Sequence, residues 1–110
     1  MTDPYKRGAV IYVDVDDTLV RHASSAPQPV THVIDQVRRL HARGFSLYCW
    51  STGGAAYAQR IATVPGVAEC FTAFLPKPTI LIDDQEISTW LLKTFHPSSV
   101  DDAALDAFLP

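Results

Sequence analysis

Residues 9–13 (AVIYV) form a short apolar run rich in β-branched side chains, and the run ends abruptly in the acidic stretch 14–17 (DVDD). A continuous apolar run of this length is typical of a strand buried in a parallel sheet. It therefore predicts a central strand that delivers carboxylates to a loop. Three further apolar runs follow at 45–50, 71–75 and 79–82, and the last also ends in paired acids, Asp83 and Asp84.

The segments between these runs have helical signals. One set of apolar residues falls on a single face at helical spacing before Gly44, which stands where the C-terminal glycine of a helix belongs: Val30, Val33, Ile34, Val37 and Leu40. An alanine-rich segment up to Ala62 and residues 86–95 are also expected to be helical. Ser99 and Asp102 resemble a capping box for a last short helix. The polar stretch 21–29 is expected to be a loop.

Strands that alternate with helices predict right-handed crossovers and a parallel sheet. With 110 residues, 47% of them hydrophobic, the chain suffices for one core, so we expect a single domain over 1–110. The expected fold is α/β, a three-layer Rossmann-like parallel sheet with helices on both faces. No cap domain is expected, because only a short loop follows the first strand and one helix and one strand fill the stretch from 51 to 77.

The composition of the chain favours some classes of partner and one type of cellular compartment over others. The net charge of −3 disfavours nucleic acid as a partner, and the basic cluster at 38–43 is interpreted as a solvated helix face. The apolar runs are far shorter than the eighteen or more residues of a membrane span, so no membrane partner is expected. Only Cys49 and Cys70 are present, too few for a disulfide framework, which favours a reducing compartment and a cytoplasmic protein.

Asp14 and Asp16 are two residues apart, so their side chains point the same way if extended geometry persists beyond the strand. Two carboxylates in one small volume predict a cation, a raised pKa, or both. In parallel sheets, ligands bind beyond the carboxyl ends of the strands, where Asp83 or Asp84 would join the pair. Such an all-oxygen site suits Mg²⁺, whereas no calcium-binding loop or His/Cys grouping points to Ca²⁺ or Zn²⁺.

Two further groups at this edge could bind an anion. Ser51 follows the second strand, and the amides of Gly53 and Gly54 open the next helix. Lys77, between two prolines, follows the third strand and offers a positive charge. Carboxylates, a divalent ion, a hydroxyl and a lysine together are what phosphoryl transfer through an aspartyl-phosphate requires.

In this order, the residues resemble the four motifs of the haloacid dehalogenase (HAD) superfamily of hydrolases, in its minimal, capless phosphatase type. The matching segments are 11–19 (IYVDVDDTL), 47–51 (LYCWS), Lys77-Pro78 and 80–84 (ILIDD). The first motif is the most specific of the four. The resemblance covers residues 9 to about 95.

The resemblance implies a phosphoric monoester hydrolase in which Asp14 is the nucleophile and Asp16 the general acid and base. It implies that Asp14, the backbone carbonyl of Asp16, and Asp83 hold Mg²⁺, with Asp84 bound through water or as a supporting partner; which of the two is the direct ligand stays open. Ser51 would bind a phosphoryl oxygen, with Thr52 as the alternative. Lys77 would balance charge on the nucleophile and the transferring group. No other cofactor is expected.

Members without a cap tend to act on phosphate groups of macromolecules or to borrow a lid from a partner subunit. The expected partner is therefore a phosphorylated substrate of unknown identity. The loop with Arg21 and His22 is the local candidate for substrate contact, although His22 is more often a bystander. A receiver domain of a signalling relay also uses acidic residues, a Ser or Thr and a Lys around Mg²⁺, but it has no acidic pair after its lysine. Here Asp83 and Asp84 follow Lys77, and this order disfavours a receiver domain. The alternative is a HAD-fold metal-binding or regulatory module without useful turnover, or a structural metal site.

Overall fold

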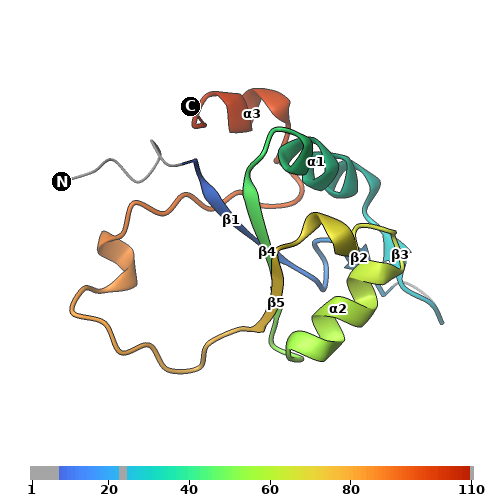
Figure 1. Cartoon of the computed structure of the whole chain (residues 1–110), viewed down its shortest axis with the longest axis horizontal. Helices are drawn as coiled ribbons and strands as arrows, with labels where there is room; N and C mark the ends of the chain where they lie inside the picture. The colour runs from blue at the N-terminus through green and yellow to red at the C-terminus, as the bar shows by residue number, and fades with distance from the viewer. Residues whose placement is uncertain (1–7, 23–24, 110) are drawn as a thin grey trace.

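The computed structural model describes residues 8–22 and 25–109, which form an α/β structure with a parallel sheet of three strands (Figure 1). The strands are β1 (Val10–Asp14), β2 (Val20–Arg21), β3 (Gln28–Pro29), β4 (Ser46–Ser51) and β5 (Ala73–Pro76). The α-helices are α1 (Thr31–Ala42), α2 (Ala55–Thr63) and α3 (Asp102–Asp106), and two short 3₁₀ helices are η2 (Ala68–Cys70) and η3 (Ile87–Thr89).

The parallel sheet has the strand order β1–β4–β5. Its register pairs Asp14 with Trp50, and Trp50 with Leu75, so the three strands end at one common edge. This edge is called the carboxyl edge below. The strands predicted at 9–13, 45–50 and 71–75 are therefore confirmed, with bounds shifted by one or two residues.

Both long helices pack on one face of the sheet. Residues alternate along the strands, so Val13, Leu47 and Cys49 are buried while Tyr12 and Tyr48 turn to the opposite face. The connections β1–α1–β4 and β4–α2–β5 step across the sheet in the same direction, and right-handed crossovers then put their helices on the same side. Figure 1 shows α1 and α2 together on one side of β4 and β5.

The core lies between this sheet face and the two helices. The helical spacing in the sequence predicted the contribution of α1 to this core, because the apolar face expected for this helix is the face that is buried. Its members are buried apolar side chains, all aliphatic or small except one phenylalanine: Val13, Val15, Leu19, Val20, Val30, Val33, Ile34, Val37, Leu40, Leu47, Cys49, Ala58, Ile61, Ala62, Val67, Cys70, Phe71 and Leu105.

The three-layer arrangement with helices on both faces is not confirmed. The second face of the sheet, called the open sheet face below, carries aromatic side chains. The ring of Tyr12 stacks on Tyr48 with 5.2 Å between centroids and meets Trp50 edge to face at 4.8 Å. Tyr12 keeps 46% of its surface exposed and Val10 keeps 63%. Helices on this face would need crossovers in the opposite direction, and the described residues contain none.

The predicted strand at 79–82 is wrong. Only Lys77 and Pro78 separate Thr79 from the end of β5, whereas a parallel strand needs a crossover of about a dozen residues to return to the start of the sheet. The segment instead leaves the sheet as an extended arm (Figure 1), with Ile80 and Ile82 exposed at 80% and 97%. The predicted helix at 86–95 is reduced to η3, since no surface is there to cover its apolar face.

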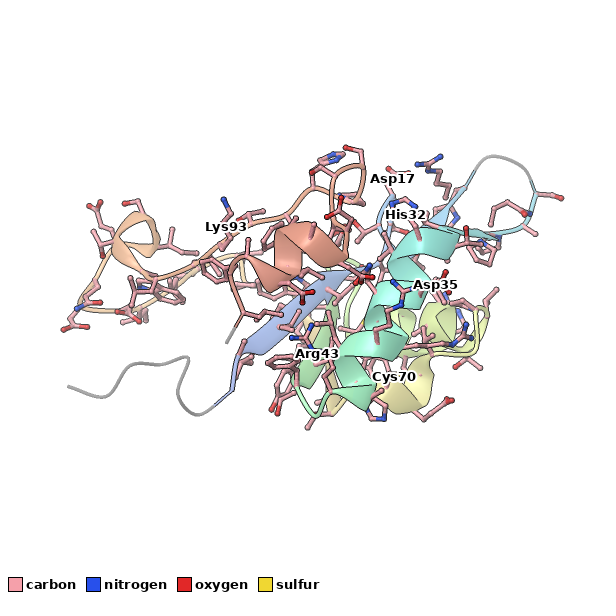
Figure 2. All side chains as sticks on the ribbon, turned by 90° about the horizontal axis from the view of Figure 1, so that it is seen from above. Asp17, His32, Asp35, Arg43, Cys70 and Lys93 are labelled. Atoms are coloured by element: carbon pink, nitrogen blue, oxygen red, sulfur yellow. The ribbon has the colours of Figure 1, made fainter. Side chains whose placement is uncertain are left out.

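The last helix is present but begins differently from the prediction. Asp101, not Ser99, caps α3, and its side chain accepts a hydrogen bond from the amide of Ala104 (2.8 Å). The helix docks on α1 through ion pairs Arg39–Asp102 (2.8 Å) and Arg43–Asp106 (2.9 Å). Figure 2 shows α3 beside α1, with the segment 78–95 extending to the side away from α1.

The segment predicted as a loop, 21–29, contains a short hairpin at its two ends. Val20 pairs with Pro29 and Arg21 with Gln28, while residues 23–24 lie outside the described ranges. In the described part of the chain, only this hairpin lies between the loop after β1 and helix α1, so no cap domain is evident there. None of the described helices is long and apolar enough to cross a membrane.

Candidate active site

The loop after β1 is held from inside by one carbonyl. The carbonyl of Val15 accepts hydrogen bonds from the amides of Leu19 (2.9 Å) and Val20 (3.3 Å), and these three side chains are fully buried. Asp17 closes the turn at φ +61°, a left-handed conformation that Asp adopts more readily than most residues. With Val15 turned inward, the side chains on either side of it are directed to the carboxyl edge.

Asp14 lies at the end of β1 and has a partner on each oxygen. Lys77 Nζ is 3.0 Å from Oδ1, and Thr18 Oγ1 donates to Oδ2 at 3.2 Å. The backbone of Lys77 is fixed because its amide donates to the carbonyl of Ser51 at 2.9 Å, and its ammonium also lies 5.8 Å from the ring centre of Trp50. The sequence prediction that Asp14 and Lys77 meet at this edge is thus matched by the structure.

Asp16 accepts two hydrogen bonds on the same oxygen. Tyr57 Oη donates to Oδ1 at 2.6 Å, and His22 Nε2 lies 2.7 Å from that oxygen. Partial burial alone would raise the pKa of Asp16, but the bonds from Tyr57 and His22, with the positive charge of Lys77, outweigh burial and lower this pKa. The bond to Asp16, with burial, raises the pKa of Tyr57, so the phenol stays protonated and donates.

Ser51 reaches the carboxyl edge but is turned inward. Its side chain is 1% exposed, and its Oγ accepts a hydrogen bond from the amide of Gly53 at 3.0 Å. Thr52, the alternative anion-binding hydroxyl, is exposed. Gly54, at φ +101°, precedes the first turn of α2, so the helix N-terminus opens beside both hydroxyls.

The second acidic pair is not brought to this centre. Asp83 and Asp84 are exposed in the arm after β5, where Asp83 Oδ1 accepts a hydrogen bond from the amide of Gln85 (2.9 Å). The described residues hold no group of three or more His, Cys, Asp or Glu side chains that could bind a metal ion. Of the four predicted Mg²⁺ ligands, the structure therefore brings together Asp14 and Asp16 only.

The fit of Mg²⁺ to the residues present is partial. Asp14, Asp16 and the hydroxyl of Thr18 supply only oxygen donors, and Mg²⁺ in proteins often uses one or two carboxylates and keeps several waters. The donor set is chemically suitable. It is also incomplete, because Lys77 rather than a third carboxylate neutralises Asp14.

Sequence reasoning missed Tyr57 and undervalued His22. Tyr57 stands in the first turn of α2, directly beyond the carboxyl end of β4, so its position in the chain already places it at the correct edge. His22 follows β2 by one residue, on the hairpin beside the same loop. A search for hydrogen-bonding side chains in the first helical turn after each strand would have found Tyr57.

Comparison of the chain with known proteins gives no match. No protein-family model, no curated protein and no solved structure matches the sequence.

Proposed function

We propose that this protein is a Mg²⁺-dependent phosphatase that works through an aspartyl-phosphate on Asp14. The observation that carries the proposal is the contact between Asp14 Oδ1 and Lys77 Nζ at 3.0 Å, with Asp16 two residues further along the same loop. A carboxylate at a strand end, neutralised by an ammonium and flanked by a second carboxyl group, has the parts of a covalent phosphoryl-transfer site.

In the first half of the reaction, an oxygen of Asp14 forms a bond to phosphorus while the bond from phosphorus to the ester oxygen breaks. The carboxyl group of Asp16, which takes up a proton when the negatively charged phosphate ester binds beside it, gives that proton to the departing oxygen, so the leaving group departs as a neutral alcohol. Lys77 offsets the negative charge shared by Asp14 and the phosphoryl group during the transfer.

In the second half, Asp16 acts as a carboxylate. It takes a proton from water as the water oxygen bonds to phosphorus, and the bond between phosphorus and Asp14 breaks. Inorganic phosphate leaves, Asp14 is restored, and Asp16 releases to solvent the proton that it took from water, or gives it to the next leaving group. A bound Mg²⁺, held by Asp14 and the main-chain carbonyl of Asp16, would supply further charge neutralisation at the phosphoryl oxygens.

Asp83 and Asp84 enter this proposal through movement of the arm 78–95. Six residues lead from Lys77 to Asp83, a contour of up to about 20 Å, which is enough to fold back over the carboxyl edge as a loop. Ile82 and Leu92 are exposed at 97% and 61%, so closure over the open sheet face would bury apolar surface. We propose that this closed form provides the third layer and the remaining carboxylate ligand.

The substrate is proposed to be a phosphate group on a macromolecule, or a smaller ester covered by a lid from a partner subunit. The described hairpin and arm form no cap over Asp14, which is itself partly exposed. The net charge of −3 and the acidic loop disfavour nucleic acid. The free, buried thiols of Cys49 and Cys70 favour the cytoplasm as the site of action.

Hydrolysis of an aryl phosphate tests the proposal, with Mg²⁺ or chelator and with Asp14→Asn as the decisive variant. Asp17→Asn is the matched control, because Asp17 is the exposed acid of the same loop and asparagine tolerates its positive φ. Mg²⁺-dependent turnover that Asp14→Asn abolishes and Asp17→Asn retains would support the phosphatase.

The second candidate is a metal-binding or regulatory module without turnover. It is favoured by one observation: Asp83 and Asp84 are exposed in the segment after β5, and the described residues hold no group of three or more side chains that could complete the magnesium site. Absence of turnover together with a higher Tm in Mg²⁺ would favour this module over the phosphatase.

A further inference from the structure

We infer that Tyr57 and His22 are positioning residues that fix Asp16 as the proton donor and acceptor, an inference that rests on the proposed phosphatase function. Both donate to Oδ1 of Asp16, at 2.6 Å and 2.7 Å, from different parts of the fold. Among the described residues, no hydrogen bond reaches Oδ2. One oxygen of the carboxyl group is thus occupied, and the other is left for the reacting atoms.

The two donors restrict Asp16 in a way that one donor would not. A single hydrogen bond lets a carboxylate swing about its donor, whereas two donors on one oxygen fix the plane of the group. Tyr57 and His22 also approach each other, with 3.4 Å between Oη and Nε2, so the three side chains form one connected cluster. We call Tyr57, Asp16 and His22 the Asp16 clamp. General acid and base catalysis needs this geometry because the proton must travel along a short, aligned path.

The Tyr57 side of the clamp is built into the backbone. A Cβ atom on Gly53 would lie 2.9 Å from Cδ2 and 3.1 Å from Cγ of Tyr57, so the ring packs where only glycine leaves room. The guanidinium of Arg60 lies 5.4 Å from the ring centre. The phenol is therefore held by contacts along the ring as well as by its hydroxyl.

The His22 side of the clamp comes from the hairpin. His22 directly follows β2, whose Val20 is fully buried and paired with Pro29. The side chains of His22 and Asp16 are 43% and 41% exposed, so this contact lies at the entrance to the site. The hairpin consequently supplies a hydrogen-bond donor to Asp16 and limits the movement of the Asp16 side chain toward solvent.

The clamp predicts that the loss in kcat/KM on replacing Tyr57 or His22 depends on the leaving group of the substrate. The proton from Asp16 matters most when the departing oxygen is strongly basic, as in phenyl phosphate, and less when it is a good leaving group, as in 4-nitrophenyl phosphate. Since kcat/KM reports on steps up to the first irreversible one, it isolates transfer to Asp14 from later hydrolysis of the aspartyl-phosphate. A purely structural role would lower kcat/KM for both esters alike.

The experiment compares Tyr57→Phe, His22→Leu and His22→Gln with the wild-type protein in Mg²⁺. Tyr57→Phe keeps the ring on Gly53 and removes only the hydroxyl, and His22→Gln keeps an N–H donor of similar reach. Tyr48→Phe is the control, since Tyr48 lies on the open sheet face and stacks on Tyr12. Thermal unfolding of each variant shows that the fold is intact.

For Tyr57→Phe and His22→Leu, kcat/KM for phenyl phosphate is expected to fall about ten- to a hundred-fold. The loss for 4-nitrophenyl phosphate should be several-fold smaller, with KM nearly unchanged. His22→Gln and Tyr48→Phe should stay close to wild type. Equal losses in kcat/KM for the two esters, or wild-type kcat/KM in every variant, would overturn the clamp. The phosphatase proposal would still stand in that case, provided that the wild-type protein shows turnover that depends on Asp14. No Asp14-dependent turnover by the wild type would overturn both.

Discussion

Alanine at Gly53 tests whether the placement of the Tyr57 ring determines the position of Asp16. The added Cβ would lie 2.9 Å from Cδ2 and 3.1 Å from Cγ of Tyr57, whereas carbon atoms in contact stay about 3.5–4.0 Å apart. The ring must therefore move by roughly 0.5–1 Å. The hydroxyl of Tyr57 is 2.6 Å from Asp16, and a shift of this size carries it to or beyond the limit of a good hydrogen bond.

The magnitude follows from the bond that is lost. A hydrogen bond to a charged group contributes about 1.5–3 kcal/mol, and His22 retains part of the restraint on Asp16. We expect a loss of about 1–2 kcal/mol in transition-state stabilisation, which is roughly a 5- to 30-fold lower kcat/KM for phenyl phosphate. Stability should change little, because overpacking of about 1 kcal/mol is offset by the lower entropy of the unfolded alanine chain. Gly53 does not have a positive φ, so alanine adds no backbone strain there.

A double-mutant cycle separates this mechanism from a general disturbance of the loop. If Gly53→Ala acts only by displacing the hydroxyl, Gly53→Ala in a Tyr57→Phe background should cause no further loss in kcat/KM. The assay is kcat/KM for phenyl phosphate in Mg²⁺, with Tm measured for all four proteins. Losses that add in the double variant, or a Gly53→Ala protein as active as wild type, would refute the reasoning.

Three further outcomes are expected. Lys77→Met should lower kcat for an aryl phosphate about 100-fold with the fold intact, and an unchanged kcat would remove Lys77 from the mechanism. Burial, with a carboxylate nearby, raises the pKa of Cys49 from 9.0 to about 12, so the stability it contributes is complete below about pH 9 and is lost as the pH rises toward 12. Between pH 9 and 11, the Tm of wild type should therefore fall more than that of Cys49→Ala; parallel curves would contradict this. Hydrogen bonds from Gln36 and Arg39 lower the pKa of Asp102 below 3.8, so its contribution is present above that pH and lost as the pH falls further. Asp102→Asn should lower Tm at pH 7, and the difference in Tm from wild type should shrink below about pH 4. A difference in Tm that stays constant with pH would contradict the lowered pKa of Asp102.

Local patterns predicted the three strands and two long helices because the signals lie within each element. The apolar runs at 9–13 and 45–50 and the spacing of Val33, Val37 and Leu40 each report burial of a single face. The contact between Asp14 and Lys77 was also predictable, since parallel strands share a carboxyl edge whatever their order.

The strand expected at 79–82 shows where local patterns fail. Its apolar run is as convincing as the first one, but pairing depends on the connection, and Lys77 and Pro78 are too few residues for a parallel crossover. The same short connection explains the missing layer on the open sheet face. The number of residues between successive apolar runs is therefore a better guide to pairing than the runs themselves.

The partners of Asp16 depend on a close approach that the sequence pattern does not express. Tyr57 reaches Asp16 because Gly53 leaves room for its ring, and the two positions are four apart across the start of α2. Helical periodicity reports which side chains are buried, not which polar atoms meet. Tyr57 is only partly buried at the edge of the core and His22 is exposed, so the signals that identified the core did not report the hydrogen bonds of these two side chains.

The contacts of Asp14 indicate which of its oxygens attacks in the proposed reaction. Lys77, which is itself charged, holds Oδ1 at 3.0 Å, whereas the uncharged hydroxyl of Thr18 donates to Oδ2 at the longer distance of 3.2 Å. A long bond from an uncharged hydroxyl is weaker than a contact between an ammonium and a carboxylate, so Oδ2 is released more readily than Oδ1. Attack through Oδ2 leaves Lys77 on Oδ1, where it continues to neutralise the group that carries the phosphoryl. Thr18 therefore orients the resting nucleophile, and Lys77 remains bound throughout the transfer.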